Sequence, residues 1–166
     1  MEQDLKTSEE RYRLLAENAN DVIWTLDMQG RFTYVSPSVR KLLGYTSAEA
    51  MQQTLHESLM PQARLLIDEA IRGNAAAIRA GLPIPQFHAE LEHTRKDGSP
   101  VWTEVTANGV LNAEGRYVGL LGITRDISER KQRDDYKHFY SHILEMLATG
   151  HGLATILQAI VQGIEA

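Results

Sequence analysis

Residues 87–124 carry the pattern of an antiparallel β-meander. In the first two segments apolar and polar side chains alternate, with Phe87, Ala89 and Leu91 apolar in one and Val101, Thr103, Val105 and Ala107 on one face of the other. Residues 96–98 and 112–115 have turn composition, and residues 117–124 form a nearly continuous apolar strand. The pattern predicts three consecutive antiparallel strands with one buried face.

A further pair of strands is predicted upstream. Residues 21–27 and 31–36 are rich in β-branched and aromatic side chains, and residues 28–30 between them have the composition of a tight turn. The sequence therefore predicts a hairpin followed by the meander. Together they make a five-stranded sheet with helices inserted between the second and third strands.

The inserted segment predicts several short helices. Residues 37–43 begin with Pro37 and are followed by Gly44, a common combination of helix start and helix end. Short helical turns are expected at 47–51 and 55–58, and a stronger amphipathic helix runs from Pro61 to near Gly73. Residues 73–85 fit either a helical continuation that ends at Gly81 or a long connection.

The hydrophobic period changes from two to about three and a half after Asp126. This predicts a long helix that leaves the sheet, with a coiled-coil seam made by Tyr136, Phe139, Ile143 and Met146. Gly150 and Gly152 interrupt it, and a second amphipathic helix follows. Near the other terminus, a capping-box spacing predicts a short amphipathic helix at residues 8–18.

Composition excludes several classes of function. The chain of 166 residues has no cysteine, which rules out disulfides, thiolate metal sites and a cysteine nucleophile. Its formal net charge of -5 argues against a nucleic-acid or acidic-membrane surface. No apolar run approaches the ~20 residues that cross a bilayer, and the charged N-terminus does not fit a secretory signal, so we expect a cytoplasmic location.

Three strings in one order carry a family resemblance. LLAENANDVIWTLDMQGRFTYVSPSVRKLLGY, HTRKDGSPVWTEV and GLLGITRDISERK together resemble the PAS family over about residues 8–131. The resemblance implies an α+β fold, an antiparallel five-stranded sheet whose short helices form a cup over one face. It also implies a sensory module that passes its signal through a DIT-type motif, here Asp126, Ile127 and Ser128, into the helix that follows.

The resemblance also suggests how the chain is organised. We expect an N-terminal flanking helix at 1–20, a PAS core at 21–126, a signalling helix at 127–149 and the truncated start of another domain at 150–166. The tail HILEMLATGHGLATILQAIVQGIEA is similar to the beginning of a GAF domain, an arrangement found in cyclic di-GMP signalling proteins. The apolar final helix suggests a fragment of a longer protein, with an output domain such as a histidine kinase, diguanylate cyclase or phosphodiesterase in cis.

Strand alternation selects the residues that face the cup. The candidate pocket residues are Trp24, Leu26, Ser36, Leu91, His93, Thr103, Val105, Gly122 and Thr124. In ligand-binding members of the family, positions such as Ser36, His93, Thr103 and Thr124 often contact the bound molecule. The alternative is that these polar groups bond to one another or to the backbone, because an unpaired buried polar group costs ~1–3 kcal/mol.

The identity of any cofactor stays unknown, although the sequence argues against two coloured ones. The helix predicted from Pro61 has no histidine where haem-binding members place their axial ligand; His56 precedes it and His88 faces away from the predicted interior. A covalently photoactive flavin is excluded because its cysteine is missing. A noncovalent flavin stays open, with Trp24 and Trp102 available for stacking, although both are equally ordinary as core residues. His138 and His142 have an i, i+4 spacing, but without a third ligand we interpret them as solvated and predict no metal site.

Two functions remain open, since the sequence offers no catalytic constellation. The first is sensing, in which a small molecule or partner changes how Asp126 to Ser128 pack and so changes the exit helix. The second is a ligand-free dimerisation and spacer module. For either function we expect a parallel homodimer through the N-terminal helix and the seam, whose apolar stripe would otherwise face water.

Overall fold

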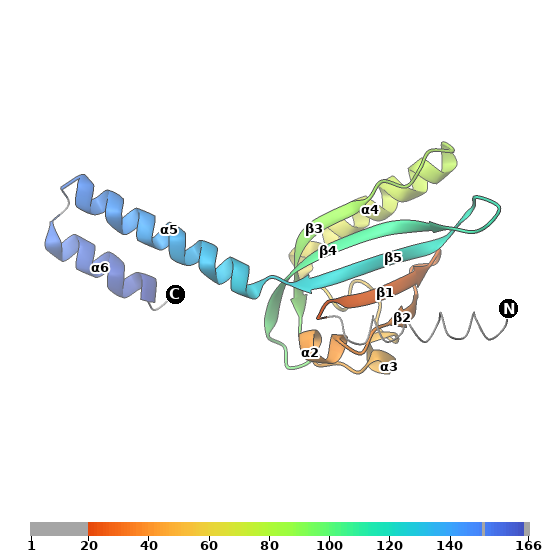
Figure 1. Ribbon diagram of the computed structural model, residues 1–166, viewed down its shortest axis with the longest axis horizontal. Helices are drawn as coiled ribbons and strands as arrows, with labels where there is room; N and C mark the ends of the chain where they lie inside the picture. Colours follow the sequence, from red (N-terminus) through yellow and green to blue (C-terminus); the bar gives the residue numbers. More distant parts are fainter. Residues whose placement is uncertain (1–19, 151, 165–166) are drawn as a thin grey trace. The chain divides into compact units, whose positions relative to one another are not determined.

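The computed structural model describes residues 20–150 and 152–164, and its strands form a five-stranded antiparallel sheet (Figure 1). Its strand order is β2-β1-β5-β4-β3. The strands are β1 (Val22–Asp27), β2 (Phe32–Val35), β3 (Phe87–Thr94), β4 (Pro100–Leu111) and β5 (Tyr117–Asp126). The predicted hairpin, meander and α+β fold are confirmed. The helix predicted at residues 8–18 lies outside the described residues.

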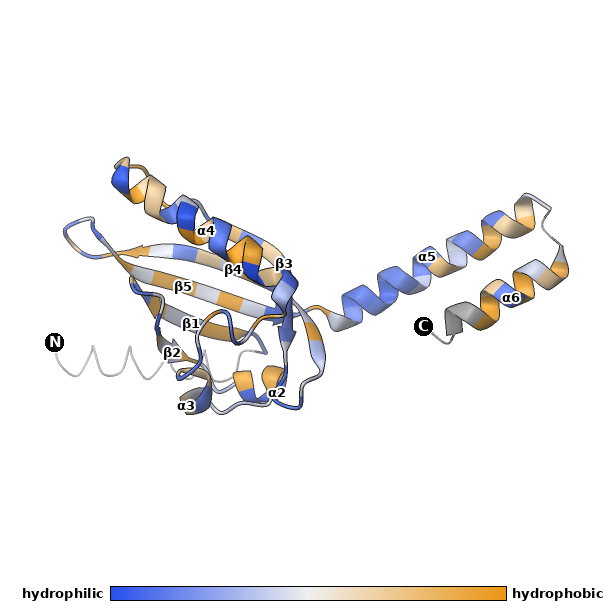
Figure 2. Cartoon of the chain, turned by 180° about the vertical axis from the view of Figure 1, so that it is seen from behind, coloured by the Kyte–Doolittle hydropathy of each residue, from blue (hydrophilic) through white to orange (hydrophobic). Residues whose placement is uncertain are grey.

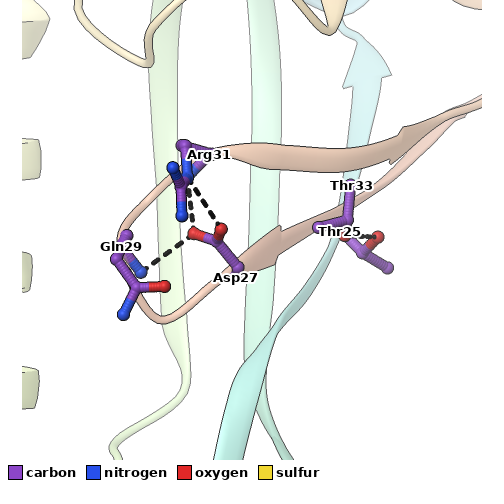
Figure 3. Close-up of polar contacts among 5 residues, drawn as sticks. All are labelled: Thr25, Asp27, Gln29, Arg31 and Thr33. Atoms are coloured by element: carbon purple, nitrogen blue, oxygen red, sulfur yellow. Dashed lines mark hydrogen bonds and ion pairs between the residues drawn. The ribbon is translucent and has the colours of Figure 1, made fainter.

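The β1–β2 hairpin is closed by the carboxylate of Asp27 (Figure 3). It accepts hydrogen bonds from the backbone N–H groups of Gln29 and Arg31, both at 2.9 Å, and from Arg31 Nε at 3.0 Å. The backbone N–H of Arg31 is the largest cause of the lowered pKa of Asp27. Farther along the hairpin the hydroxyls of Thr25 and Thr33 lie 2.6 Å apart. This turn fixes the register that sends alternate β1 side chains inward.

Two short helices, α2 (Val39–Leu43) and α3 (Ser47–Ala50), follow the hairpin. Helix α2 ends at Gly44, whose φ of 82° is the left-handed conformation that glycine adopts readily. A capping box between Thr46 and Glu49 starts α3. Glu49 also binds Lys96 at 2.7 Å, a hydrogen bond that is the main reason the pKa of Glu49 falls to about 2. Helix α3 is thereby linked to the β3–β4 turn, and α2 is linked to it by the hydrogen bond from the backbone N–H of Lys96 to the carbonyl of Leu43 at 2.8 Å.

Helix α4 (Pro61–Arg79) is longer than the helix that the sequence pattern ends near Gly73. Its last turn closes at Ala80, and Gly81 takes a φ of 69°. Of the two predictions for residues 73–85, the helical continuation ending at Gly81 is the one confirmed. A single glycine inside a helix costs only about 1 kcal/mol relative to alanine, and the alanine-rich turn after Gly73 compensates for it. Residues 55–58 form turns and no helix.

One face of the sheet packs against these helices, and α4 lies across β3 and β4 (Figure 2). The buried apolar residues of this core are Val22, Trp24, Leu26, Val35, Val39, Leu42, Leu43, Ala50, Leu59, Ala63, Ile67, Leu91, Val101, Val105 and Ala107. The opposite face exposes Trp102, Leu121 and Ile123 to a large extent. The alternation read from the sequence therefore describes one buried and one open face.

The chain divides into two compact units at the junction of Ile127 and Ser128. The second unit contains α5 (Ser128–Ala148) and α6 (Leu153–Ile164), which contact each other. Its buried side chains are Met146 and Ile156. Figure 2 shows that the beginning of α5 is hydrophilic and that α6 is largely hydrophobic. Within residues 20–150 and 152–164, no helix is both long and apolar enough to cross a membrane.

The predicted seam residues lie in different environments within the helical unit. Tyr136 is 65% exposed, Phe139 and Ile143 are partly buried, and Met146 is 8% exposed. Since α6 packs against α5 in the same chain, part of the apolar stripe is covered without a second copy.

Candidate ligand cavity

A cavity of about 100 Å³ lies inside the core of the sheet unit. Side chains from all five strands and from α2, α3 and α4 line it, and most of them are apolar. The volume is of the order of the ~150 Å³ at which an apolar cavity in another protein binds benzene. It is smaller than the roughly 300–1,000 Å³ typical of pockets for drug-sized ligands. The space suits a molecule about the size of one aromatic ring.

Six of the nine predicted pocket residues line this cavity: Trp24, Leu26, Leu91, His93, Val105 and Thr124. The other three, Ser36, Thr103 and Gly122, are buried next to it without forming its lining. The strand alternation placed every predicted pocket residue that lies on a strand on the correct face of the sheet. Which of these side chains reach the cavity depends on the hydrogen bonds and contacts that each one makes.

His93 is the most deeply buried titratable side chain of the cavity lining. It lies near the end of β3, pairs with Leu59 in an isolated β-bridge and is 8% exposed. Its Nδ1 lies 2.8 Å from the hydroxyl of Thr103, and that hydroxyl donates a hydrogen bond to the carbonyl of Leu91 at 3.0 Å. Burial lowers the pKa of His93 to about 4, so the ring is neutral at physiological pH.

Thr103 is fully buried because its hydroxyl is used within the sheet. The register places Thr103 opposite Leu91, and both of its hydrogen-bond partners belong to β3. It therefore supports His93 from behind and has no role in the lining itself.

A second buried hydrogen bond crosses from β1 to β5. The indole N–H of Trp24 donates to the hydroxyl of Thr124 at 2.9 Å. Gly122, which pairs with Trp24 in the β1–β5 register, lies directly under the indole, and a Cβ at this position would collide with the ring. Only glycine at position 122 lets the indole of Trp24 lie flat against β5. For the same reason this position contributes no side chain to the cavity lining.

The hydroxyl of Ser36 forms hydrogen bonds at the end of β2 and not in the cavity. This hydroxyl accepts a hydrogen bond from the backbone N–H of Ile23 at 2.9 Å and lies 2.6 Å from the hydroxyl of Ser38. Ser38 in turn donates to the carbonyl of Asp21 at 2.8 Å. Ser36 therefore joins the end of β2 to β1 and to the start of α2, and its polar group does not reach the cavity.

The connecting segments supply lining residues that sequence reasoning missed. Gln53 and Ser58 come from the segment after α3, Asn74 comes from α4, and Ile84 and Pro85 come from the segment before β3. The backbone N–H of Ile84 donates to the hydroxyl of Tyr117 at 2.8 Å, which holds that segment near the sheet. No periodicity marks these residues, since only long-range contacts place them.

A groove between α4 and β3 adjoins the cavity. Four residues line both of them: Ala70, Asn74, Pro85 and Phe87. These four residues are the shared walls of the cavity and the groove, and the cavity is closest to the groove where they lie.

The predicted coupling residues stand where the sheet ends. Asp126 is the last residue of β5, and its carboxylate lies 3.9 Å from Arg95 Nη2. Ile127 is buried, and its N–H donates to the carbonyl of Trp102 at 3.0 Å. Ser128 is the first residue of α5. Arg125, the neighbour of Asp126 in the chain, forms a bidentate pair with Asp21.

The other histidines among the described residues lie outside the cavity. His56 Nε2 lies 2.7 Å from a carboxylate oxygen of Asp68, and His88 contacts the hydroxyl of Thr106 on the outer surface, as the alternation predicted. His138 and His142 are exposed on α5, and His151 lies outside the described residues. Across the part of the chain that the structure describes, no group of three or more metal-ligating side chains is present.

Comparisons with known proteins agree with this architecture. The family model "PAS domain" matches residues 20–129. The chain is 23% identical over 131 residues to the "Sensor histidine kinase TmoS" of Ectopseudomonas mendocina, which covers 79% of this chain but 13% of that protein. The chain therefore spans a small part of the length of this relative.

Solved structures show the same fold. One is the PAS domain of a protein from Colwellia psychrerythraea, with a TM-score of 0.59 and 24% identity, covering 72% of this chain and 97% of that one. Another is the N-terminal domain of a diguanylate cyclase with PAS/PAC sensor from Marinobacter aquaeolei, with a TM-score of 0.54 and 19% identity, covering 67% and 98%.

The strand order, the helices over one face and the family match over most of the sheet unit point to a single conclusion. The chain belongs to the PAS domain family, whose domains are sensory modules and not catalysts.

Proposed function

We propose that this PAS domain binds a small molecule in the cavity of the sheet unit and transmits the binding event through α5 to an output domain. The observation that supports the proposal is the cavity itself, an apolar space of about 100 Å³ bordered by one buried histidine. A well-packed core has few voids larger than a water molecule, so a space of this size at the centre of the fold favours a ligand.

The route of transmission runs through Asp126, Ile127 and Ser128. Ile127 is held by β4 through the carbonyl of Trp102, and α5 begins one residue later. A ligand that changes the packing of β4 and β5 therefore acts directly on the first turn of α5. The size of the response is limited by the difference in affinity of the ligand for two arrangements of this junction.

The output domain is inferred from the relatives. The matched proteins include a sensor histidine kinase and a diguanylate cyclase with PAS/PAC sensor, so we place a kinase or cyclase downstream in cis. On this reading residues 1–20 flank a core at 21–126, residues 127–149 are the signalling helix and residues 150–166 begin a further domain with GAF-like sequence. The sensor then works in the cytoplasm.

The transmission step is tested with Asp126→Ala in the full-length protein. We expect ligand binding and the fold to persist while the stimulus-dependent change in output activity is lost. Asp135→Ala on the exposed surface of α5 is the matched control and keeps the response. A normal stimulus-dependent change in Asp126→Ala would remove this residue from the proposed route.

A second candidate function is a ligand-free dimerisation and spacer module. It is favoured by the helical unit, where Tyr136, Tyr140, Leu144 and Leu147 of α5 are each more than half exposed. Native mass spectrometry of the purified chain separates the two functions. A bound mass supports sensing, whereas a dimer without added mass, unchanged by small molecules, supports the spacer.

A further inference from the structure

The hydrogen bonds behind His93 determine which of its ring nitrogens carries the proton. The hydroxyl of Thr103 has one hydrogen, and its geometry directs that hydrogen to the carbonyl of Leu91. The same oxygen lies 2.8 Å from Nδ1 of His93, where it acts as an acceptor. Both contacts are satisfied together only if Nδ1 is protonated and donates to Thr103. The opposite assignment forms one hydrogen bond instead of two.

A neutral imidazole holds a single proton, so Nε2 is left with a lone pair. Among the described residues, every fully enclosed polar side-chain atom has a hydrogen-bond partner, and the side-chain hydrogen bond of His93 is the one at Nδ1. Nε2 is therefore a ring nitrogen that remains accessible, and the ring that carries it lines the cavity.

The other buried polar groups of the lining are already engaged. Thr124 accepts the indole N–H of Trp24, and Ser58 donates to the carbonyl of Leu55 at 3.0 Å. Around them the walls are mainly aliphatic and aromatic. The remaining polar side chains of the lining, Gln53 and Asn74, are only partly buried. His93 Nε2 thus provides a directional acceptor in the buried part of a surface that otherwise selects by size and hydrophobicity.

We propose that the cavity selects apolar molecules about one aromatic ring in size that donate a hydrogen bond to His93 Nε2, namely small phenols, anilines or azoles with a free N–H. The inference rests on the proposed ligand-binding function and names the class of ligand. A molecule without a donor leaves the buried acceptor unpaired. A carboxylate brings a second acceptor to Nε2 and is rejected.

The proton assignment is measured first, without a ligand. Long-range ¹⁵N–¹H spectra of the full chain distinguish a protonated from an unprotonated ring nitrogen, and we expect His93 to show a protonated Nδ1 and an unprotonated Nε2. Thr103→Val removes the acceptor that positions the proton, so both tautomers then appear. A protonated Nε2 in the unaltered chain would overturn the inference.

The ligand class is tested with phenol and fluorobenzene, which share a ring and nearly the same volume but differ in the hydrogen-bond donor. We expect phenol to bind at least about 10-fold more tightly, since a site built to pair with an O–H discriminates strongly against an analogue without one. The preference disappears in His93→Leu and persists in His88→Leu, a change at an exposed position of the same strand. Benzoate does not bind.

The outcomes separate this inference from the proposed function. Equal binding of phenol and fluorobenzene overturns the donor rule but leaves a ligand cavity in place. Binding of neither molecule overturns both. If His93→Leu fails to fold, the tautomer spectra and the phenol preference of Thr103→Val, which does not alter the lining, still decide the matter, because a mixed tautomer must reduce that preference.

Discussion

The two units of the chain deal with apolar side chains in opposite ways. Up to Ile127, a sheet and three helices enclose a core in which leucines such as Leu26 and Leu91 are 3% exposed. Among the described residues from Ser128 onward, two helices bury Met146 and Ile156 but leave seven large apolar side chains more than half exposed: Tyr136, Tyr140, Leu144, Leu147, Leu153, Leu157 and Val161. The sheet unit completes its own core, and the helical unit does not.

The exposed apolar residues of α5 and α6 are spaced so that they line up along each helix. Those on α5 recur at intervals of four, four and three, and those on α6 at intervals of four. Such intervals place side chains on one stripe of each helix. Because extended apolar stripes are rare on the surface of monomers, we propose that the helical unit forms one half of an interface.

The largest expected effect comes from making the same substitution in both units. Leu26→Ala opens a cavity in the closed core and is expected to lower the free energy of unfolding by about 2–5 kcal/mol. Leu144 is 61% exposed, so Leu144→Ala is expected to change the free energy of unfolding by no more than about 0.5 kcal/mol. Both tryptophans of the chain, Trp24 and Trp102, lie in the sheet unit, so urea titrations followed by tryptophan fluorescence report that unit. Similar losses for both variants would break the comparison.

The second prediction concerns acid and His93. Its pKa falls from 6.5 in the unfolded chain to about 4 in the fold. Between these values the unfolded chain binds a proton that the folded chain does not, so stability is full above pH 6.5 and decreases as the pH falls toward 4. The loss amounts to about 3 kcal/mol.

Urea titrations across this pH range measure the slope. In His93→Leu the slope should become much shallower, whereas His88→Leu, on the outer face of β3, should keep it. An unchanged slope in His93→Leu would show that other groups cause the acid sensitivity of the sheet unit.

A smaller effect is expected at the hydrogen bond between Trp24 and Thr124. Thr124→Val keeps the shape of the side chain but leaves the buried indole N–H without its acceptor, at a cost of about 1–3 kcal/mol. Thr25→Val makes the same exchange at the solvated hairpin shown in Figure 3 and should cost far less. Tryptophan fluorescence during urea unfolding compares the two, and equal costs would argue that the buried bond contributes little.

The smallest effect on the sheet unit is expected from charges placed on the helical stripes. Leu144→Glu combined with Leu157→Glu should alter the stability of the sheet unit by no more than about 0.5 kcal/mol. The same pair should convert the proposed homodimer to a monomer in sedimentation experiments. If the unaltered chain is already monomeric well above micromolar concentrations, the exposed stripes have another partner.

Much of this fold follows from periodicity and turn chemistry. The alternation at residues 87–107 placed Leu91, His93 and Val105 on the inner face, and the turn at residues 28–30 located the first hairpin. Two ends of α4 remained possible from the sequence, because Gly73 is a local helix breaker and the alanine-rich residues after it favour a continuation to Gly81, which is the one observed. A glycine or proline indicates a local preference to end a helix, and the residues of the neighbouring helical turns can override that preference.

The cavity was less predictable than the sheet around it. Alternation assigns a side chain to a face, but it does not tell which hydroxyl finds a backbone partner first, as Ser36 and Thr103 do. Lining residues such as Gln53 and Ile84 come from irregular segments that carry no period. Likewise, the seam pattern at Met146 identifies an apolar stripe without indicating that α6 covers part of it.

The shared walls of the cavity and the α4–β3 groove have a kinetic consequence. A ligand that leaves the cavity through these shared walls leaves only as often as side chains such as Asn74 and Phe87 move apart. Local openings of this kind occur over microseconds to seconds. By this route, the residence time of a bound molecule, and with it the duration of a signal after the stimulus is gone, would depend on the rate of these openings and not on affinity alone.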